Sequence, residues 1–145
     1  MFLLGSREMK KVIVLLLCLL TTLVLSGGIL SCQSENQSTS DEDTIRAYAD
    51  PATETTLQGL SENNLAKYIQ YGSPEFKAAM TEERLTEAST QIDNQLGTYQ
   101  SKEFLYTEEQ EGYILVHYKA TYTKGEVGIR MVFDKDHRVA GQWFE

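Results

Sequence analysis

The stretch YILVHYKATY, residues 113–122, decides the fold class of this chain. Its apolar and aromatic side chains recur at every second position, at Ile114, Val116, Tyr118, Ala120 and Tyr122. The side chains of a β-strand alternate between the two faces of a sheet, so this period predicts a long strand with one buried face. His117 and Lys119 fall on the opposite face, which predicts that His117 and Tyr118 do not serve the same pocket.

The same period predicts three more strands around this one. Alternating apolar residues stand upstream at Phe104 and Tyr106, and downstream at Val127, Ile129, Met131, Phe133, Val139 and Trp143. The intervening turns, at residues 111–112, 124–125 and 134–137, are short enough for antiparallel hairpins, so we expect a four-stranded meander. The aromatic residues on one face of this meander are expected to belong to the core, with their hydroxyl and indole N–H groups at its edge. These residues are also the candidate lining of a ligand cavity: Tyr106, Tyr118, Tyr122, Met131 and Trp143.

Helical signals fill residues 44–97. The pairs Asp50–Pro51 and Ser73–Pro74 each combine a capping side chain with a first-turn proline, which predicts a helix start. Thr81 opens the longest predicted helix, which closes at Gly97 and carries the apolar stripe Leu85, Ala88, Ile92 and Leu96. Each helix has one apolar face and needs a partner surface. The predicted fold class is therefore α+β, with N-terminal helices packed on one face of a four-stranded antiparallel sheet over residues 44–145.

Residues 1–31 have the three-part layout of a lipoprotein signal peptide. A basic stretch at residues 7–11 precedes an apolar run at residues 12–25, and small residues follow. The apolar run is shorter than the roughly 20 residues that cross a bilayer, but a count that continues to Leu30 leaves a retained transmembrane anchor as an alternative. Met9, which precedes two lysines, is an alternative start to Met1.

Ile29, Leu30 and Ser31, directly before Cys32, resemble the bacterial lipobox. This resemblance implies that the Cys32 thiol receives a diacylglyceryl group and that cleavage follows Ser31. Two acyl chains hold a protein stably on a membrane, whereas one chain holds it only marginally. We therefore expect lipidated Cys32 to be the first residue of the mature protein, and Cys18 to be a small apolar residue of the signal peptide.

Residues 32–43 are predicted to be a disordered polar tether, because the segment after Cys32 has no apolar side chain to bury. The formal charge of the whole chain is -8, and removal of the basic signal peptide makes the remainder more acidic. Such a surface repels phosphate groups, which argues against nucleic acid as a partner and leaves membrane binding to the acyl chains of Cys32. The expected location is outside the cytoplasm, lipid-anchored on the outer face of the cell membrane or in the cell envelope.

Segments of the predicted domain resemble a known family: LGTY at residues 96–99, GYILVHYKA at residues 112–120, VFDKD at residues 132–136 and VAG at residues 139–141. They look like a bacterial and archaeal domain family of unknown function. Over roughly residues 47–145, the resemblance implies a nuclear-transport-factor-2-like, or cystatin-like, fold, in which helices close over a curved sheet to make a cone. Members are typically secreted proteins or lipoproteins, and some precede an α/β-hydrolase domain. This chain ends at Glu145 without one, so no hydrolytic residue is carried over.

The residue patterns of familiar catalytic and metal sites are missing from the sequence. His117 and His137 are its only histidines, and it contains no CxxC, HExxH or GxSxG motif. Residues 134–137, DKDH, have the composition of a hairpin turn. We therefore predict no catalytic residue, no metal and no cofactor.

Two functions of different classes remain open. The favoured one is a non-catalytic binding or accessory module, in which an aromatic-lined concavity or an exposed sheet face holds a small apolar ligand, a peptide or another envelope protein. The alternative is a small cone-fold enzyme, which requires ionisable groups with displaced pKa values in one pocket. A carboxylate or histidine beside Tyr118 and Trp143 would favour the enzyme. Self-association as a homodimer through the open sheet face is compatible with the first function.

Overall fold

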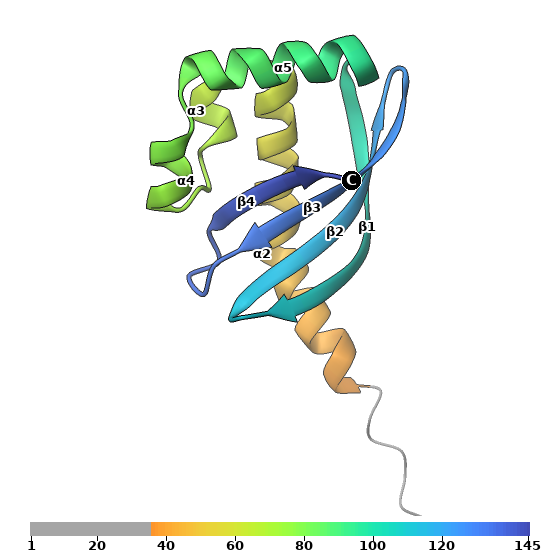
Figure 1. The fold of residues 1–145 in the computed structure, drawn as a ribbon. Coiled ribbons are helices and arrows are strands. Elements are labelled where there is room, and N and C mark those ends of the chain that lie inside the picture. Colours follow the sequence, from red (N-terminus) through yellow and green to blue (C-terminus); the bar gives the residue numbers. More distant parts are fainter. Residues whose placement is uncertain (1–35) are drawn as a thin grey trace, which may run out of the picture. The chain divides into compact units, whose positions relative to one another are not determined.

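A computed structural model describes residues 36–145, with side chains from Asp41 onward. Its elements are α2 (Asn36–Ser61), α3 (Leu65–Tyr68), α4 (Pro74–Ala79), α5 (Glu82–Leu96), β1 (Tyr99–Gln110), β2 (Tyr113–Tyr122), β3 (Gly125–Phe133) and β4 (Val139–Phe144) (Figure 1). The predicted signal peptide, Cys32 and the first residues of the predicted tether lie outside the described residues. Within residues 36–145, no helix is both long and apolar enough to cross a membrane.

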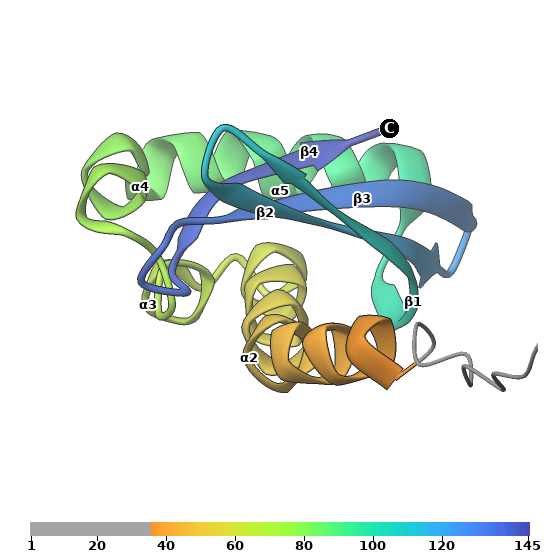
Figure 2. The ribbon, with the colours of Figure 1, turned by 90° about the horizontal axis from the view of Figure 1, so that it is seen from below.

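The four strands form one antiparallel sheet in the order β1-β2-β3-β4. Tyr118 of β2, for example, lies opposite Phe104 of β1 and Ile129 of β3. Figure 2 shows that the sheet is strongly twisted and that α2 and α3 lie on the same side of it. In Figure 1, α5 crosses one end of the domain. The predicted α+β class and the predicted meander are therefore confirmed.

Helix α2 is continuous through Pro51, so the predicted helix start at Asp50 is wrong. A proline removes one hydrogen bond from a helix interior and usually bends or ends the helix. Here Pro51 lies on the exposed side of α2, whereas the buried side continues past it through Ala49 and Ala52. Packing of this apolar side against the sheet offsets the lost hydrogen bond. The helix also includes residues 36–43 of the predicted tether.

Two other predicted helix starts are confirmed by their capping hydrogen bonds. The Ser73 hydroxyl accepts a hydrogen bond from the Phe76 N–H at 3.1 Å and begins α4. The Thr81 hydroxyl accepts one from the Arg84 N–H at 3.3 Å and begins α5. The predicted end of α5 at Gly97 is also confirmed, with a φ of 81° that glycine adopts without strain.

The core lies between α2 and one face of the sheet, which we call the inner face. Its buried residues come from α2 and from strands β2 to β4: Ala49, Ala52, Leu57, Val116, Tyr118, Ala120, Tyr122, Ile129, Met131, Phe133 and Val139. A second buried cluster, of Leu60, Tyr68 and Leu85, joins α2, α3 and α5. The opposite face of the sheet, in front in Figure 1, has no helix of residues 36–145 over it.

A β-bulge interrupts the alternation of β1. Phe104 pairs with Tyr118, but Tyr106 pairs with His117, so β1 has one extra residue between the two pairs. An extra residue moves every side chain beyond it to the other face of the sheet. Phe104 therefore meets the Tyr118 ring edge to face in the core, whereas Tyr106 points outward and is 47% exposed. The expectation that Tyr106 belongs to the core face is wrong for this reason.

A second bulge has the same effect in β4. Val139 pairs with Phe133 and is fully buried, and the register then shifts by one residue. Trp143 consequently pairs with Arg130 and is 46% exposed. The expectation that Trp143 shares the core face of Val139 is therefore also wrong.

The close contact of α2 with α3 at Gly59 yields a stability prediction. A Cβ atom added at Gly59 would lie 2.7 Å from the Tyr68 Cα. Alanine normally stabilises a helix interior by roughly 0.5–1 kcal/mol relative to glycine. We expect Gly59→Ala instead to lower the free energy of unfolding by about 1–3 kcal/mol, because the added methyl group overlaps the Tyr68 backbone. Urea denaturation followed by the fluorescence of Trp143 measures this change.

Gly125→Ala is the matched control, because an added Cβ at Gly125 meets nothing within 4 Å. It should change the free energy of unfolding by less than about 0.5 kcal/mol. A Gly59→Ala variant more stable than the wild type would contradict the close packing of α2 on α3.

Candidate functional site

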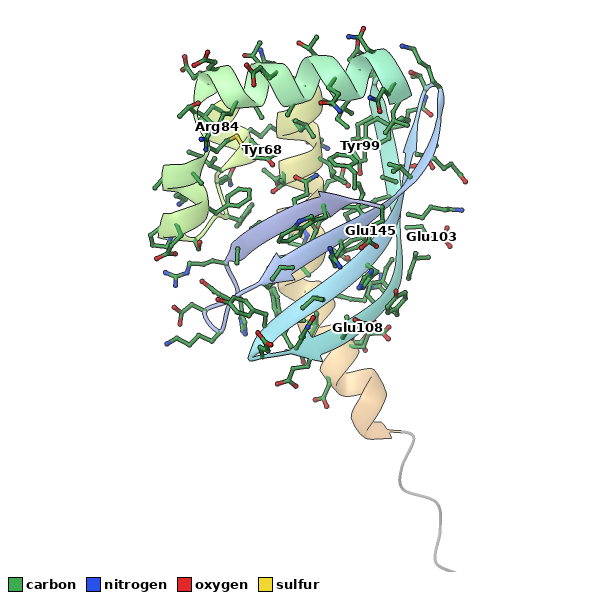
Figure 3. The ribbon with its side chains drawn as sticks, viewed as in Figure 1. Tyr68, Arg84, Tyr99, Glu103, Glu108 and Glu145 are labelled. Carbon is green, nitrogen blue, oxygen red and sulfur yellow. The ribbon has the colours of Figure 1, made fainter. Side chains whose placement is uncertain are left out.

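The candidate functional site is the sheet face that no described helix covers, which we call the open face. It comprises Glu103, Tyr106, Glu108 and Gln110 of β1, Tyr113, Leu115, His117 and Lys119 of β2, Glu126, Arg130 and Val132 of β3, and Gly141, Trp143 and Glu145 in and after β4. Figure 3 shows Glu108 and Glu145 on this side of the sheet, whereas Tyr99 lies toward the helices. Tyr106, Tyr113 and Trp143 are 44–47% exposed, and such a group of aromatic side chains typically marks a binding surface.

His117 lies at the centre of the open face, beneath Tyr106. The two rings stack with their centroids 4.3 Å apart and their planes 12° apart. The His117 Nδ1 atom is 3.5 Å from a carboxylate oxygen of Glu145, and its Nε2 atom is 3.9 Å from one of Glu108. The imidazole is only 9% exposed and therefore forms the floor of this part of the face.

Trp143 is fixed in place by its neighbours on the open face. The Arg130 guanidinium lies 5.2 Å from the centre of the Trp143 ring, and it also pairs with Glu145 at 3.3 Å. The indole lies over Gly141, where any side chain would collide with it. The bulge turns Trp143 outward, and Gly141 provides the space for its ring.

A pocket of about 300 Å³ lies beside Trp143. Its lining comes from all four strands and from the β1–β2 turn: Gln110, Glu111, Tyr113, Leu115, Arg130, Val132 and Trp143. Leu115 and Val132 are paired across β2 and β3, and they supply an apolar floor. The pocket thus has apolar and aromatic walls, with Glu111 and Arg130 as its charged groups.

A larger hollow, of about 560 Å³, follows the polar side of α5. Its described lining comes from α5 alone: Thr86, Glu87, Thr90, Gln91, Asn94 and Gln95. Side chains from one side of a single helix do not converge on a ligand as those of the sheet pocket do. We therefore take the open face, and not α5, as the site.

The inner face contains a carboxylate that was not expected there. The Tyr118 hydroxyl donates a hydrogen bond to Asp50 of α2 at 2.9 Å. Lys102 lies 3.5 Å from the same Asp50 oxygen and 4.6 Å from the centre of the Tyr118 ring. Arg46 pairs with the other Asp50 oxygen at 3.3 Å. One carboxylate thus holds a buried phenol and two cations together.

A second tyrosine is held in the same way, because the Tyr99 hydroxyl donates to Glu54 at 2.8 Å. Sequence reasoning missed both carboxylates because it began a helix at Asp50 and so treated this residue as a cap. The signal that could have found them is the spacing of Arg46, Asp50 and Glu54, which recur every four residues and share one side of a continuous helix.

The structure separates the five candidate cavity residues. Tyr118 and Met131 are fully buried and Tyr122 is 3% exposed, and all three are packed within the core. Tyr106 and Trp143 lie on the open face instead. No single cavity is therefore lined by this set, and the carboxylate beside Tyr118 is not near Trp143.

The buried Tyr68, Tyr118 and Tyr122 and the partly buried Tyr99 are held in their neutral form. Burial raises the pKa of Tyr118, and the Asp50 carboxylate raises it further. Burial also raises the pKa of Tyr99, and Glu54 adds to the effect. The pKa values of Tyr68 and Tyr122 are raised to about 12 by burial. These phenols can donate hydrogen bonds, but they do not supply phenolate near neutral pH.

The described residues do not bring together a metal-binding group. In residues 36–145, no three His, Cys, Asp or Glu side chains converge as metal ligands would. The predicted lipidation site, Cys32, lies outside this range.

The fold and the site define an α+β domain that buries one face of a meander under its helices and exposes aromatic and acidic residues on the other. Residues 53–141 match the family model described as "Protein of unknown function (DUF3887)", and the chain belongs to this family. This agrees with the expectation of a domain family of unknown function. Neither the curated proteins nor the solved structures contain a match to the chain.

The raised tyrosine pKa values predict how the protein responds to alkali. A phenol whose pKa is raised by folding adds stability that is complete below the unfolded pKa of about 10 and is lost as pH rises above it. We expect the buried tyrosines to ionise only as the protein unfolds, well above pH 10. Absorbance at 295 nm reports the ionisation, and circular dichroism reports the unfolding in parallel.

Tyr118→Phe identifies the contribution of one residue to this titration. It should remove one ionisation from the phase that accompanies unfolding and leave any earlier phase unchanged. Complete ionisation of all eight tyrosines with the fold intact would contradict the burial of Tyr118 and the hydrogen bond of Tyr99 to Glu54.

Proposed function

We propose that this chain is a membrane-tethered extracytoplasmic lipoprotein whose domain is a non-catalytic binding module. The open face is its binding surface, and the occupant is a peptide segment of another envelope protein. The tether is lipidated Cys32, as the segment of residues 29–32 suggests by its likeness to a lipobox.

The observation that carries this proposal is the exposure of Tyr106, Tyr113 and Trp143 on one face beside a pocket. Aromatic residues dominate the binding energy of protein interfaces because they bury a large area with few rotatable bonds. The pocket, at about 300 Å³, is at the lower end of the range that encloses small ligands. Tyr106 is exposed on the same face outside the pocket lining, which suits an extended peptide with one side chain in the pocket and another over Tyr106.

The hydrogen bond between Tyr118 and Asp50 is the one observation in favour of the enzyme alternative. It pairs a phenol with a carboxylate, as some cone-fold enzymes do. However, Asp50 is already engaged by Lys102 and Arg46, and Tyr118 is fully buried under α2. A substrate would have to displace these two cations to use Asp50 and could not reach the buried Tyr118, so the binding module is the better supported function.

The tether is tested by changing the cysteine that would carry the lipid. Cys32→Ala should move the protein from the membrane fraction to the soluble fraction, because the protein then carries no acyl chain to anchor it. Immunoblots of fractionated cells measure the distribution, and Cys18→Ala is the matched control that should remain membrane-bound. Membrane retention of Cys32→Ala would instead favour the apolar segment of residues 12–30 as an uncleaved anchor.

The binding surface is tested by site-specific photo-crosslinking in intact cells. A photoreactive residue at Tyr113, within the pocket lining, should form an adduct with another envelope protein that mass spectrometry identifies. The same residue at Gln91, on the polar side of α5, should form none. An adduct of twice the mass of the chain would replace the envelope partner by a second copy, and no adduct from Tyr113 would refute the binding function.

A further inference from the structure

We propose that the open face selects a cationic segment: an apolar side chain enters the pocket, and an adjacent Lys or Arg lies over Tyr106 beside Glu108. This rests on the proposed binding function and adds the chemical class of the partner.

The charge of the open face is unbalanced. Its carboxylates are Glu103, Glu108, Glu126 and Glu145, and its cations are Lys119 and Arg130. Lys119 is shared between Glu103 at 3.5 Å and Glu126 at 3.7 Å, and Arg130 pairs with Glu145. The described residues place no Lys or Arg within ion-pair distance of Glu108, whose side chain is 54% exposed. A cation from a partner would complete this pairing.

His117 provides a second and independent indication at the same place. Its Nδ1 atom lies 3.5 Å from a carboxylate oxygen of Glu145. Its Nε2 atom lies 3.9 Å from a carboxylate oxygen of Glu108, beyond hydrogen-bond distance. Nε2 is buried, and within the described residues it has no hydrogen-bond partner. An ammonium or guanidinium group that pairs with the exposed Glu108 carboxylate would lie beside this unpartnered nitrogen.

The aromatic rings provide the surface on which such a cation rests. A guanidinium already lies over one ring of this face, since Arg130 is 5.2 Å from the Trp143 ring centre. Tyr106 stacks one side of its ring on His117, and its 47% exposure leaves surface for a second cation. A cation over a tyrosine ring gains more when a carboxylate is adjacent, because both attract the same charge.

A second copy of the chain is a less suitable occupant of the same face. A symmetric dimer through the open face would bring two surfaces together that each carry four carboxylates and two basic side chains. Facing charges of the same sign disfavour such a contact. An anionic partner is opposed by the same charges.

The experiment uses the chain's only tryptophan, Trp143, as the reporter. Synthetic peptides of alternating lysine and leucine are added to the purified protein, and the fluorescence of Trp143 is recorded. Peptides of alternating glutamate and leucine, and of glutamine and leucine, are the probes of opposite and zero charge. The lysine peptide should produce a saturable change at a concentration at least about tenfold lower than either of the others, and added salt should weaken it.

Glu108→Gln should weaken binding of the lysine peptide about tenfold. Glu87→Gln on α5 is the matched control and should leave binding unchanged. Equal binding of the three peptides, or an unchanged affinity in Glu108→Gln, would overturn the cationic class. A fluorescence change that depends on protein concentration alone would identify a second copy as the occupant and would also overturn it. If Tyr113 crosslinks to an envelope protein but the lysine peptide does not bind, the charge selection fails and the binding function stands.

Discussion

The contact between the buried side of α2 and the inner face of the sheet determines how far α2 extends and which polar groups of the domain are hydrogen-bonded beneath it. The small side chains of Ala49 and Ala52 are at most 1% exposed, so the helix backbone lies close to the strands. Burial of this apolar area, at about 25 cal/mol per Å², keeps α2 helical through Pro51. The same contact covers the hydroxyl groups of Tyr118 and Tyr99. A buried hydroxyl without a partner costs about 1–3 kcal/mol, and Asp50 and Glu54 of α2 remove that cost.

The sheet thereby has one face that packs against α2 and one face that no described helix covers. On the inner face, the Tyr118 hydroxyl and the Asp50 carboxylate resemble a catalytic pair, but they are hydrogen-bonded to each other. On the open face, the two bulges place Tyr106 and Trp143 where a regular alternation would have buried them. Bulges occur often next to functional sites, where the shifted register redirects the side chains that follow. The aromatic character of the open face is therefore a consequence of backbone register.

The fold could be predicted from the sequence because burial on one face imposes a period of two on every strand. The bulges could not be predicted from that period. The extra positions, Leu105 in β1 and Ala140 in β4, are themselves apolar, so a shifted register matches the hydrophobic pattern as well as a regular one. Only the pairing of β1 with β2, and of β4 with β3, decides between the regular and the shifted register. Tyr106 and Trp143 were assigned to the core face for the same reason.

The helix around Pro51 shows a different limit of local sequence signals. An aspartate before a proline has the same appearance whether a helix begins there or continues through it. The outcome depends on whether apolar side chains upstream of the proline have a surface to cover. Ile45, Tyr48 and Ala49 have one, because they pack against the core cluster. With the helix extended, Asp50 and Glu54 face the strands, and carboxylates that seemed remote from the tyrosines become their partners.

If Cys32 is the anchor, the charge of the domain also affects which surface a partner can reach. The chain from Cys32 to the start of α2 at Asn36 spans at most roughly 14 Å. The exposed residues closest to this end of α2 include Asp41 and Asp43, which have the same sign of charge as anionic lipid headgroups. Repulsion across a Debye length of about 8 Å keeps such residues away from the bilayer surface. The open face has the same sign of net charge, so the same repulsion would act on it wherever it approached anionic lipid.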